Sequence, residues 1–378
     1  MLSMNKNLTQ YETRALRTDF NLADAHTHQN QSELEREIVA NLPNLFYEAV
    51  ASKQHEVDAL AITSYHELSG QTTANSWASS HLCYSASMAM EVVANYLRLN
   101  EIKVGLIEPT FDNIPDILKR HQIDLTPIDD EQLACSGEVN WGELLSNYAG
   151  QAIFLTLPNN PTGTYLTEFN FETLAETCKR LDILLMIDMC FRLYEPAFLY
   201  DQYKILKRVD VPCVIIEDTG KVWPALDLKF SILNCHPALS EKIYDIHSDF
   251  LLNVSPFILR VLPEFFEASK KEGFKSTRQL VKKNRAYLRD TLAGTFLEVA
   301  FPDSNISVEF LRINAPIKST ELQTHLAYDG VYVLPGDMFF WNTPALGQSY
   351  IRIALAREFN QFKASIDKLS DALKRLKF

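Results

Sequence analysis

The most constraining feature of this sequence is a series of short apolar segments between residues 103 and 235. They are rich in Ile, Val, Leu and Phe, do not alternate with polar residues, and lie at 103–108, 152–157, 183–188, 214–218 and 230–235. Unbroken apolar runs of this length are typical of strands that are covered by helices on both faces, as in a parallel sheet. We therefore expect an α/β fold with a doubly wound, mainly parallel sheet.

Helical patterns separate and follow these segments. Residues 87–99 come after a Ser-rich turn, and residues 168–181 carry acidic side chains in the first turn, where the helix dipole favours them. The last third of the chain has a different order, which is a helix, two strands and a closing helix over 275–293, 308–314, 351–356 and 360–377. This order predicts a smaller α+β unit.

The two units set the expected domain boundaries. We expect a large domain over residues 45–255 and a small domain that includes residues 256–378. Residues 1–40 are too polar to form a core alone, so we expect the N-terminal segment 1–44 to join the small domain.

The composition excludes several classes of function. The 378 residues are 47% hydrophobic with a formal net charge of −12, and no basic cluster suits nucleic acid or an anionic membrane. No apolar run reaches the length of a membrane span, and the N-terminus lacks the apolar core of a signal peptide, which predicts a cytoplasmic protein. Without a C-x-x-C pair, we expect reduced core cysteines rather than zinc ligands or disulfides at Cys83, Cys135, Cys178, Cys190, Cys213 and Cys235.

The glycines and the strand ends direct attention to another kind of site. None of the 12 glycines forms a G-x-G-x-x-G or P-loop motif, which excludes both of these nucleotide-binding classes. Ligands of a doubly wound sheet bind beyond the carboxyl ends of its strands. The polar segments at these ends are 109–113 (PTFDN), 158–163 (PNNPTG), 188–191 (DMCF) and 217–221 (EDTGK).

Taken singly, these residues have ordinary structural explanations. Asn160 is equally consistent with turn chemistry, Asp188 with a helix N-cap, and Lys221 with a solvated side chain. Ser85 and Ser87, at the start of the helix over 87–99, suit either N-caps or a phosphate site at a helix N-terminus.

The combination is far more specific. Asp188 follows Asn160 by 28 residues, Lys221 follows Asp188 by 33, and Arg352 lies in the late strand IRIALA. On these motifs the sequence resembles the fold type I pyridoxal-phosphate (PLP) enzymes of the aspartate aminotransferase superfamily, over essentially the whole chain. The resemblance implies a large PLP-binding domain and a small α+β domain.

The resemblance also implies a role for each matching residue. Lys221 forms the Schiff base with the PLP aldehyde and then transfers protons. Asp188 pairs with the pyridine nitrogen, Asn160 donates to the phenolic oxygen, and Phe111 stacks on the ring. Arg352 binds the substrate α-carboxylate. The phosphate is held by Ser85, Ser87, Thr219 and Lys229.

Three departures from the aminotransferase pattern are informative. Phe191 replaces the usual tyrosine that bonds the phenolic oxygen, and Lys229 replaces the usual phosphate-binding arginine, with two glycines lost before it. Carboxylates surround the lysine in the sequence at Glu217, Asp218 and Asp227. With these departures the chain resembles the PLP-dependent arginine oxidases and hydroxylases of the enduracididine-pathway type. The shared segments include NLTQYE, NLADAH, CYSASMAME, PTFDNI and EDTGKVWPALDLK.

This subgroup implies an oxidase of free L-arginine that uses dioxygen and needs no metal or flavin. The implied products are 4-hydroxy-2-oxoarginine and 2-oxoarginine, with ammonia and hydrogen peroxide. Thr9, Glu12 and His26 match a segment that closes over the site, and His26 is a catalytic candidate that positions water. Glu12, Asp218 and Asp227 match acids around the substrate guanidinium, some of them from the partner of a homodimer with shared sites.

Other interpretations stay open at this point. From the sequence alone Glu12 suits a solvated helix position, and His26 with His28 suits an ordinary pair of histidines better than a metal site, since no third ligand is near. The main functional alternative is a class I/II aminotransferase acting on a basic amino acid. A non-catalytic PLP-binding regulator is disfavoured, because Lys221 and Asp188 are both present and no DNA-binding appendage is evident.

Overall fold

The computed structural model describes residues 7–133 and 137–376. Its centre is a seven-stranded sheet in the order β2-β8-β7-β6-β5-β3-β4, in which neighbouring strands from β7 to β4 run parallel and β8 is antiparallel to both of its neighbours. In sheet order the strands are β2 (Ser79–Cys83), β8 (Ser231–Cys235), β7 (Cys213–Asp218), β6 (Leu184–Asp188), β5 (Ala152–Thr156), β3 (Val104–Glu108) and β4 (Leu125–Asp129).

All five predicted apolar segments are strands of this sheet, but not all are parallel. The chain returns from β7 to β8 through the loop 219–230 without a crossover helix, so β8 lies antiparallel to β7. The apolar pattern of the sequence does not reveal β2 or β4. The first is polar (SSHLC), and the second contains Pro127, which an edge strand tolerates because one side of its backbone has no partner strand.

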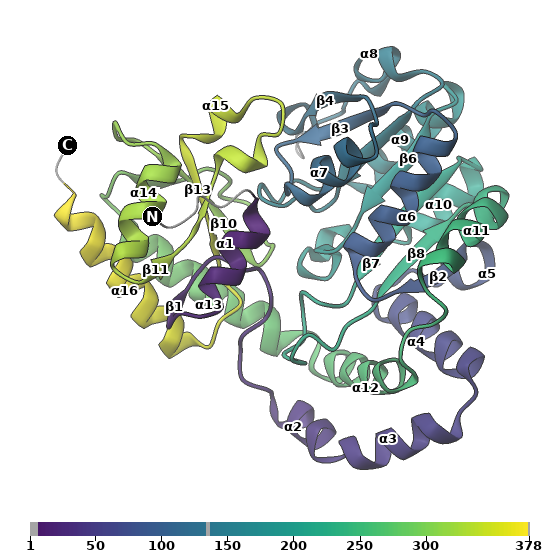
Figure 1. Cartoon of the computed structure of the whole chain (residues 1–378), viewed down its shortest axis with the longest axis horizontal. Coiled ribbons are helices and arrows are strands. Elements are labelled where there is room, and N and C mark those ends of the chain that lie inside the picture. Colours follow the sequence, from purple (N-terminus) through teal and green to yellow (C-terminus); the bar gives the residue numbers. More distant parts are fainter. Residues whose placement is uncertain (1–6, 134–136, 377–378) are drawn as a thin grey trace.

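Helices cover both faces of the sheet (Figure 1). Apolar residues of α9 (Glu168–Arg180) and α10 (Gln202–Val209) share one core with residues such as Ile153, Leu185 and Ile215. Residues of α6 (Ala86–Leu99), α7 (Asn113–Arg120) and α11 (Ser240–Phe250) share a second core with the opposite face. Short helices α5 (Ala74–Trp77) and α8 (Trp141–Leu144) belong to the first of these layers, where they pack with α10 and α9.

The C-terminal part forms a second, smaller unit that contains the four predicted elements in order, together with short strands and helices that the sequence pattern did not predict. An antiparallel sheet in the order β12-β13-β10-β9 packs beside three helices. Its elements are α13 (Lys275–Leu292), β9 (Leu297–Val299), β10 (Val308–Ile313), α14 (Ser319–Tyr328), β11 (Val331–Tyr332), β12 (Leu334–Pro335), α15 (Pro344–Gly347), β13 (Tyr350–Ala354) and α16 (Phe359–Arg375).

The N-terminal segment runs between the two lobes (Figure 1). Strand β1 (Phe20–Asn21) pairs in parallel with β11, and α1 (Leu8–Ala15) packs on β12. The chain then passes through α2 (Glu33–Ala40), α3 (Leu42–Ala51) and α4 (Gln54–Leu68), which pack against the long helix α12 (Pro256–Glu272). Residue 45 lies within α3 and residue 255 just before α12, and the domain boundaries there stay a prediction.

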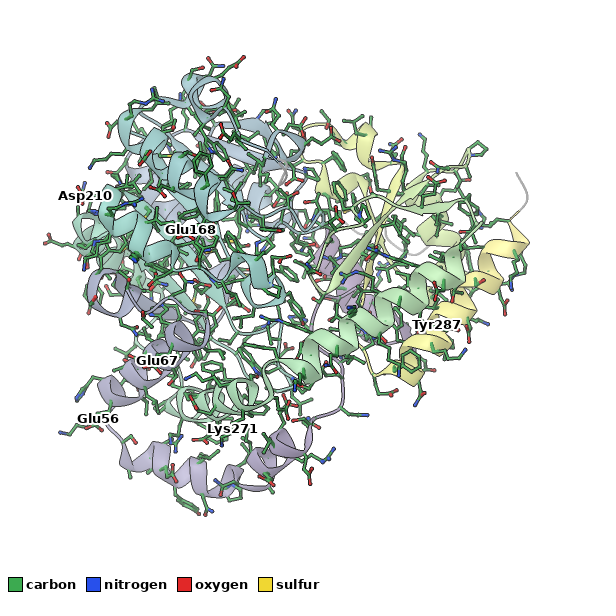
Figure 2. All side chains as sticks on the ribbon, turned by 180° about the vertical axis from the view of Figure 1, so that it is seen from behind. Glu56, Glu67, Glu168, Asp210, Lys271 and Tyr287 are labelled. Carbon is green, nitrogen blue, oxygen red and sulfur yellow. The ribbon has the colours of Figure 1, made fainter. Side chains whose placement is uncertain are left out.

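The outer surface carries much of the acidic charge. Glu56, Glu67, Glu168 and Asp210, which Figure 2 labels, are all exposed. Within residues 7–133 and 137–376 no helix is long and apolar enough to cross a membrane. The five described cysteines are free and buried, whereas Cys135 lies outside the described residues.

Candidate active site

Alternation along the strands decides which polar side chains enter the site. In β6, Leu185 and Ile187 face the core with α9, whereas Leu184 and Met186 face the core with α6. Asp188 ends the strand in step with the second set. By the same alternation, Thr156 of β5 and Asp218 of β7 end on the α6 side. All three line one cavity of about 310 Å³ at the carboxyl ends of the parallel strands.

This cavity, which we call the active-site pocket, brings most of the predicted residues together. The predicted residues that line it are Thr9, Glu12, His26, Ser85, Ser87, Phe111, Asn160, Asp188, Asp218, Lys221, Lys229 and Arg352. Thr219 and Asp227 do not line it. Lining residues to which the sequence analysis gave no role are Ala25, Ala86, Met90, Asn113, Thr156 and Cys190.

Asp188 is a buried carboxylate without a close cationic partner. It is 6% exposed, and its Oδ1 accepts a hydrogen bond from the Cys190 backbone N–H at 3.0 Å. Burial, followed by the charge of Asp218, raises its pKa to about 6, while Lys221 acts in the opposite direction. A buried carboxylate at this position is suited to a cationic group inside the pocket.

The N-terminus of α6 forms one wall of the pocket and suits an anion. Ser85 caps the helix, because its hydroxyl accepts the Met88 N–H at 3.2 Å. The Ala86 N–H donates to Asp218 Oδ2 at 3.1 Å, and Lys229 lines the same pocket. Free N–H groups at a helix start and a nearby lysine are the groups that bind phosphate. In the structure the Asp218 carboxylate accepts a hydrogen bond from one of these N–H groups, that of Ala86.

The loop after β7 carries Lys221. The Gly220 N–H donates to Asp218 Oδ1 at 2.6 Å, and a Cβ at Gly220 would lie 2.7 Å from the Lys229 side chain, so any larger residue here would displace that lysine. The Lys221 carbonyl accepts hydrogen bonds from the hydroxyls of Thr27 at 2.8 Å and Tyr194 at 2.7 Å. These backbone bonds fix the lysine at the pocket.

Thr219 serves the same loop instead of the pocket. Its hydroxyl donates to the Phe230 carbonyl at 2.8 Å and accepts the Phe230 N–H at 2.9 Å, and the residue is 2% exposed. Glu217 is also remote from the pocket, because it faces the opposite side of β7 from Asp218. There its carboxylate accepts from Arg192 Nη2 at 2.8 Å, and both side chains are fully buried. The acidic cluster suggested by the sequence is thus divided by the strand.

Arg352 joins the N-terminal segment to the pocket. It is 0% exposed, and its guanidinium donates to Asn160 Oδ1 at 3.2 Å and to Glu12 Oε1 at 3.0 Å. The guanidinium also lies 5.5 Å from the ring centre of Phe111. Its Nε is buried without a hydrogen-bond partner. Arg352 is therefore already paired with a carboxylate, that of Glu12 on α1.

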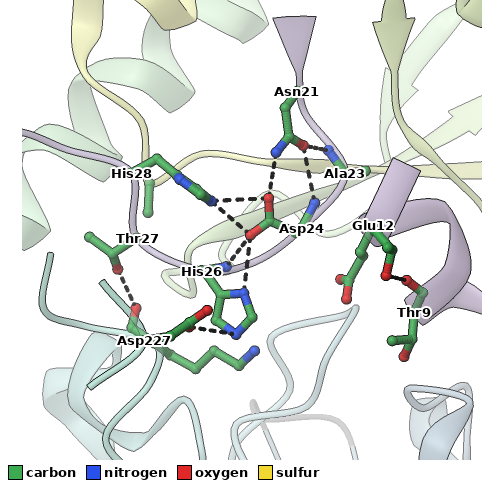
Figure 3. A network of polar contacts seen from close by, with 12 residues as sticks. Thr9, Glu12, Asn21, Ala23, Asp24, His26, Thr27, His28 and Asp227 are labelled. Carbon is green, nitrogen blue, oxygen red and sulfur yellow. Dashed lines mark hydrogen bonds and ion pairs between the residues drawn. The ribbon is translucent and has the colours of Figure 1, made fainter. Parts of the chain in front are cut away.

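His26 lies between two carboxylates (Figure 3). Its Nδ1 is 3.3 Å from Asp24 Oδ1, and its Nε2 is 3.7 Å from Asp227 Oδ1. Burial acts to raise the pKa of Asp24, but hydrogen bonds from His26 and His28 and the charge of Arg357 outweigh it and hold the pKa well below its usual range. Asp227 is 62% exposed and lines a neighbouring cavity of about 510 Å³ that shares His26 with the active-site pocket.

No group of three or more His, Cys, Asp or Glu residues suited to a metal ion occurs within the described ranges 7–133 and 137–376. His26 and His28 both contact Asp24 instead.

Comparison with known proteins agrees with this geometry. The sequence pattern of the family described as aminotransferase class I and II matches residues 61–369. The chain belongs to this family. A solved structure of MppP soaked with the product 2-ketoarginine is similar at 34% identity, with a TM-score of 0.87, and the match covers 93% of this chain and 99% of that one.

More distant relatives share the fold. Aspartate aminotransferase from Thermus thermophilus with maleate is 14% identical with a TM-score of 0.77, over 98% of this chain and 97% of that one. The cystine lyase CORI3 of Arabidopsis thaliana is 26% identical over 244 residues, which are 60% of this chain. The match spans 54%, about half, of that relative's length. The chain is therefore an enzyme of the fold type I PLP superfamily.

The residues present fit PLP. The pocket offers a lysine, a buried carboxylate without a close cation and an amide side chain, which are Lys221, Asp188 and Asn160. The N–H groups at the start of α6 and Lys229 supply donors for a phosphate. Phe191 also lines the pocket, so a phenylalanine stands where the superfamily pattern has its tyrosine.

Proposed function

We propose that this enzyme oxidises free L-arginine with PLP and dioxygen. The observation that carries the proposal is the gathering of Lys221, Asp188 and Arg352 in one pocket with the carboxylates of Glu12 and Asp218. The 34% identity to MppP, whose structure was soaked with 2-ketoarginine, supports arginine as the substrate. The carboxylates suit a guanidinium, which stays charged at any working pH and prefers carboxylate partners.

Each of these residues has a proposed role that follows from its position in the pocket. Lys221, Asp188, Asn160 and Phe111 would hold the PLP ring, with Ser85, Ser87 and Lys229 near its phosphate. When bound, PLP supplies an electron sink for the substrate Cα. The Lys221 amine takes the proton from Cα, while Arg352 binds the α-carboxylate and sets the orientation. His26, held by Asp24, orients a water molecule at the substrate side chain.

Dioxygen is the electron acceptor of the proposed reaction. L-Arginine, dioxygen and water give 2-oxoarginine, ammonia and hydrogen peroxide, since the two electrons lost at the Cα–N bond reduce dioxygen. For 4-hydroxy-2-oxoarginine, a second two-electron oxidation consumes another dioxygen and forms another hydrogen peroxide. Water supplies the hydroxyl group at C4 and releases one proton, which leaves with the hydrogen lost from carbon and the two electrons to form the second hydrogen peroxide.

The decisive experiment measures dioxygen uptake and product masses with purified enzyme, PLP and L-arginine under air. We expect uptake with both oxo acids as products, and none with Lys221→Ala, because Lys221 is the pocket lysine whose charge acts on the Asp188 carboxylate. Substitution of Lys282, which lies outside this pocket, is the control and should leave uptake unchanged.

A class I/II aminotransferase acting on a basic amino acid is the second candidate, favoured by the family itself. It predicts turnover of L-arginine without dioxygen when a keto acid is added. Equal turnover under nitrogen with an added keto acid would reject the oxidase and support the transferase. We also propose a homodimer with shared active sites, which the exposed position of Asp227 near His26 supports.

A further inference from the structure

Asp112 belongs to the PTFDN segment at the end of β3 but has no role in the site as described so far. It occupies the N-cap position of α7, yet its side chain accepts no hydrogen bond from the amides of that helix. An aspartate at this position normally caps its own helix. Asp112 is nevertheless 5% exposed, so its carboxyl group is directed into the protein.

The partner of Asp112 is the first residue of α1. The Leu8 N–H donates to Asp112 Oδ2 at 2.6 Å across 104 residues of sequence, and Leu8 is 0% exposed. The first amides of a helix have no acceptor within the helix. The cap residue Asn7 does not meet this need, because its side chain accepts from the Gln10 N–H. Asp112 therefore supplies the acceptor for a buried amide of α1.

Helix α1 is held over the pocket at a second point as well. The Glu12 carboxylate, one turn after Leu8, accepts a hydrogen bond from Arg352 Nη2 on strand β13 at 3.0 Å. Thr9, which lies between Leu8 and Glu12 in the sequence, lines the pocket. Under the proposed function, the α-carboxylate of the substrate requires Arg352 and so competes with Glu12. The contact between Leu8 and Asp112 uses no group that the substrate requires.

We propose that Asp112 is a positioning residue that docks α1 over the active-site pocket by accepting the Leu8 N–H, and that it does so while substrate displaces Glu12 from Arg352. The displacement of Glu12 from Arg352 by substrate rests on the proposed function, whereas the docking of α1 by Asp112 does not. Because the hydrogen bond needs an acceptor and not a charge, an amide at position 112 should serve as well as a carboxylate.

The test is hydrogen–deuterium exchange of the amides of residues 8–15 in the PLP-loaded enzyme, with and without L-arginine under nitrogen. In Asp112→Ala the Leu8 N–H is left buried without an acceptor, so we expect exchange to rise roughly five- to a hundredfold. Asp112→Asn should stay within about threefold of the wild type. Asp116→Asn is the matched control for loss of a carboxylate on α7, since Asp116 lies one turn after Asp112 and is not the acceptor of the Leu8 N–H.

Kinetics give a second measure. We expect Asp112→Ala to lower kcat/KM for L-arginine about as much as it raises exchange, with PLP retained and with Asp112→Asn restoring the value. Unchanged exchange in Asp112→Ala would overturn the inference, and so would Asp112→Asn if it undocks α1 as fully as alanine does. The exchange measurement without L-arginine needs no turnover, so failure to oxidise arginine would reject the proposed function separately.

Discussion

Burial raises the pKa of two carboxyl groups at or near the pocket. Asp188 and Asp112 are both almost inaccessible to water, and burial is the largest cause of the raised pKa in each. Asp24 is just as buried, but two histidines and Arg357 hold its pKa low. A sequence motif shows which carboxyl groups lie near strand ends, whereas the sign of a pKa shift depends on neighbours from distant segments. For this reason the sequence analysis singled out Asp188 but not Asp24 or Asp112.

The raised pKa of Asp112 predicts a pH dependence for the docking of α1. Burial raises this pKa from 3.8 to about 7, with the charges of Asp116 on α7 and Glu12 on α1 acting in the same direction, and with Leu8 and Arg352 on β13 opposing them. A pKa raised in the docked state favours docking of the protonated form. Docking should therefore be strongest at acidic pH and weaken as the pH rises through about 7.

The measurement is the exchange of the amides of residues 8–15 at pH 6 and pH 8, corrected for the intrinsic pH dependence of exchange. The wild type should show less protection at pH 8 than at pH 6. Asp112→Asn carries no titrating group at this position and should show equal protection at both values. Equal pH dependence in both proteins would assign the effect to another group.

Among helices and strands, the apolar pattern predicted those elements that are buried on both sides. Each predicted apolar segment became a strand, because five or six consecutive apolar residues can be covered only between two helical layers. Strands β2 and β4 were missed because polar residues and Pro127 conceal them. The direction of β8 depends on the length and path of the preceding loop, so it could not be predicted from the residues of the strand itself.

Strand alternation also explains a stability element that the sequence did not reveal. Glu217 lies next to Asp218 in sequence, but it faces the opposite side of β7 and holds Arg192, with a further hydrogen bond from the Tyr65 hydroxyl at 3.2 Å. The pair joins the end of β7 to the segment after β6. The strands that carry Asp218 and Asp188 are thus tied together behind the pocket.

Glu217→Gln should destabilise the protein strongly, because it leaves Arg192 buried without a compensating charge. We expect a loss of about 3–5 kcal/mol in the free energy of unfolding, measured by denaturant titration. Glu67→Gln is the surface control, since Glu67 is 51% exposed beside Lys270, and should change stability by at most about 0.5 kcal/mol. Equal stabilities of the two variants would show that the buried pair contributes nothing.

For the molecule as a whole, the site is assembled from three parts of the chain. Motifs located Asn160, Asp188 and Lys221 as residues of the pocket, because all three lie close in sequence to the ends of apolar segments. The docking of α1 depends on contacts across more than a hundred residues, which no local pattern records. Asp227 differs again, since it lies outside the pocket at the exposed end of the loop 222–229.

The loop 222–229 also bears on the oligomeric state of the protein. Leu226 is 94% exposed, and Leu226 and Asp227 both have a positive φ, of 51° and 61°, which costs about 1–3 kcal/mol for each non-glycine residue. An exposed leucine held in a strained turn beside the site suits contact with a second copy of the chain. Leu226→Glu should therefore weaken the proposed homodimer by at least roughly a hundredfold, since the change occurs twice in a symmetric interface.

The assembly is measured by size-exclusion chromatography with light scattering, alongside dioxygen uptake with L-arginine. Loss of the dimer in Leu226→Glu should lower uptake in parallel, because Asp227 lies next to the proposed interface and adjoins His26. Tyr328→Glu, at a residue that is 83% exposed on α14, should change neither the mass nor the uptake. A wild-type protein that is monomeric and fully active would reject shared sites, and a Leu226→Glu variant that stays dimeric would place the interface elsewhere.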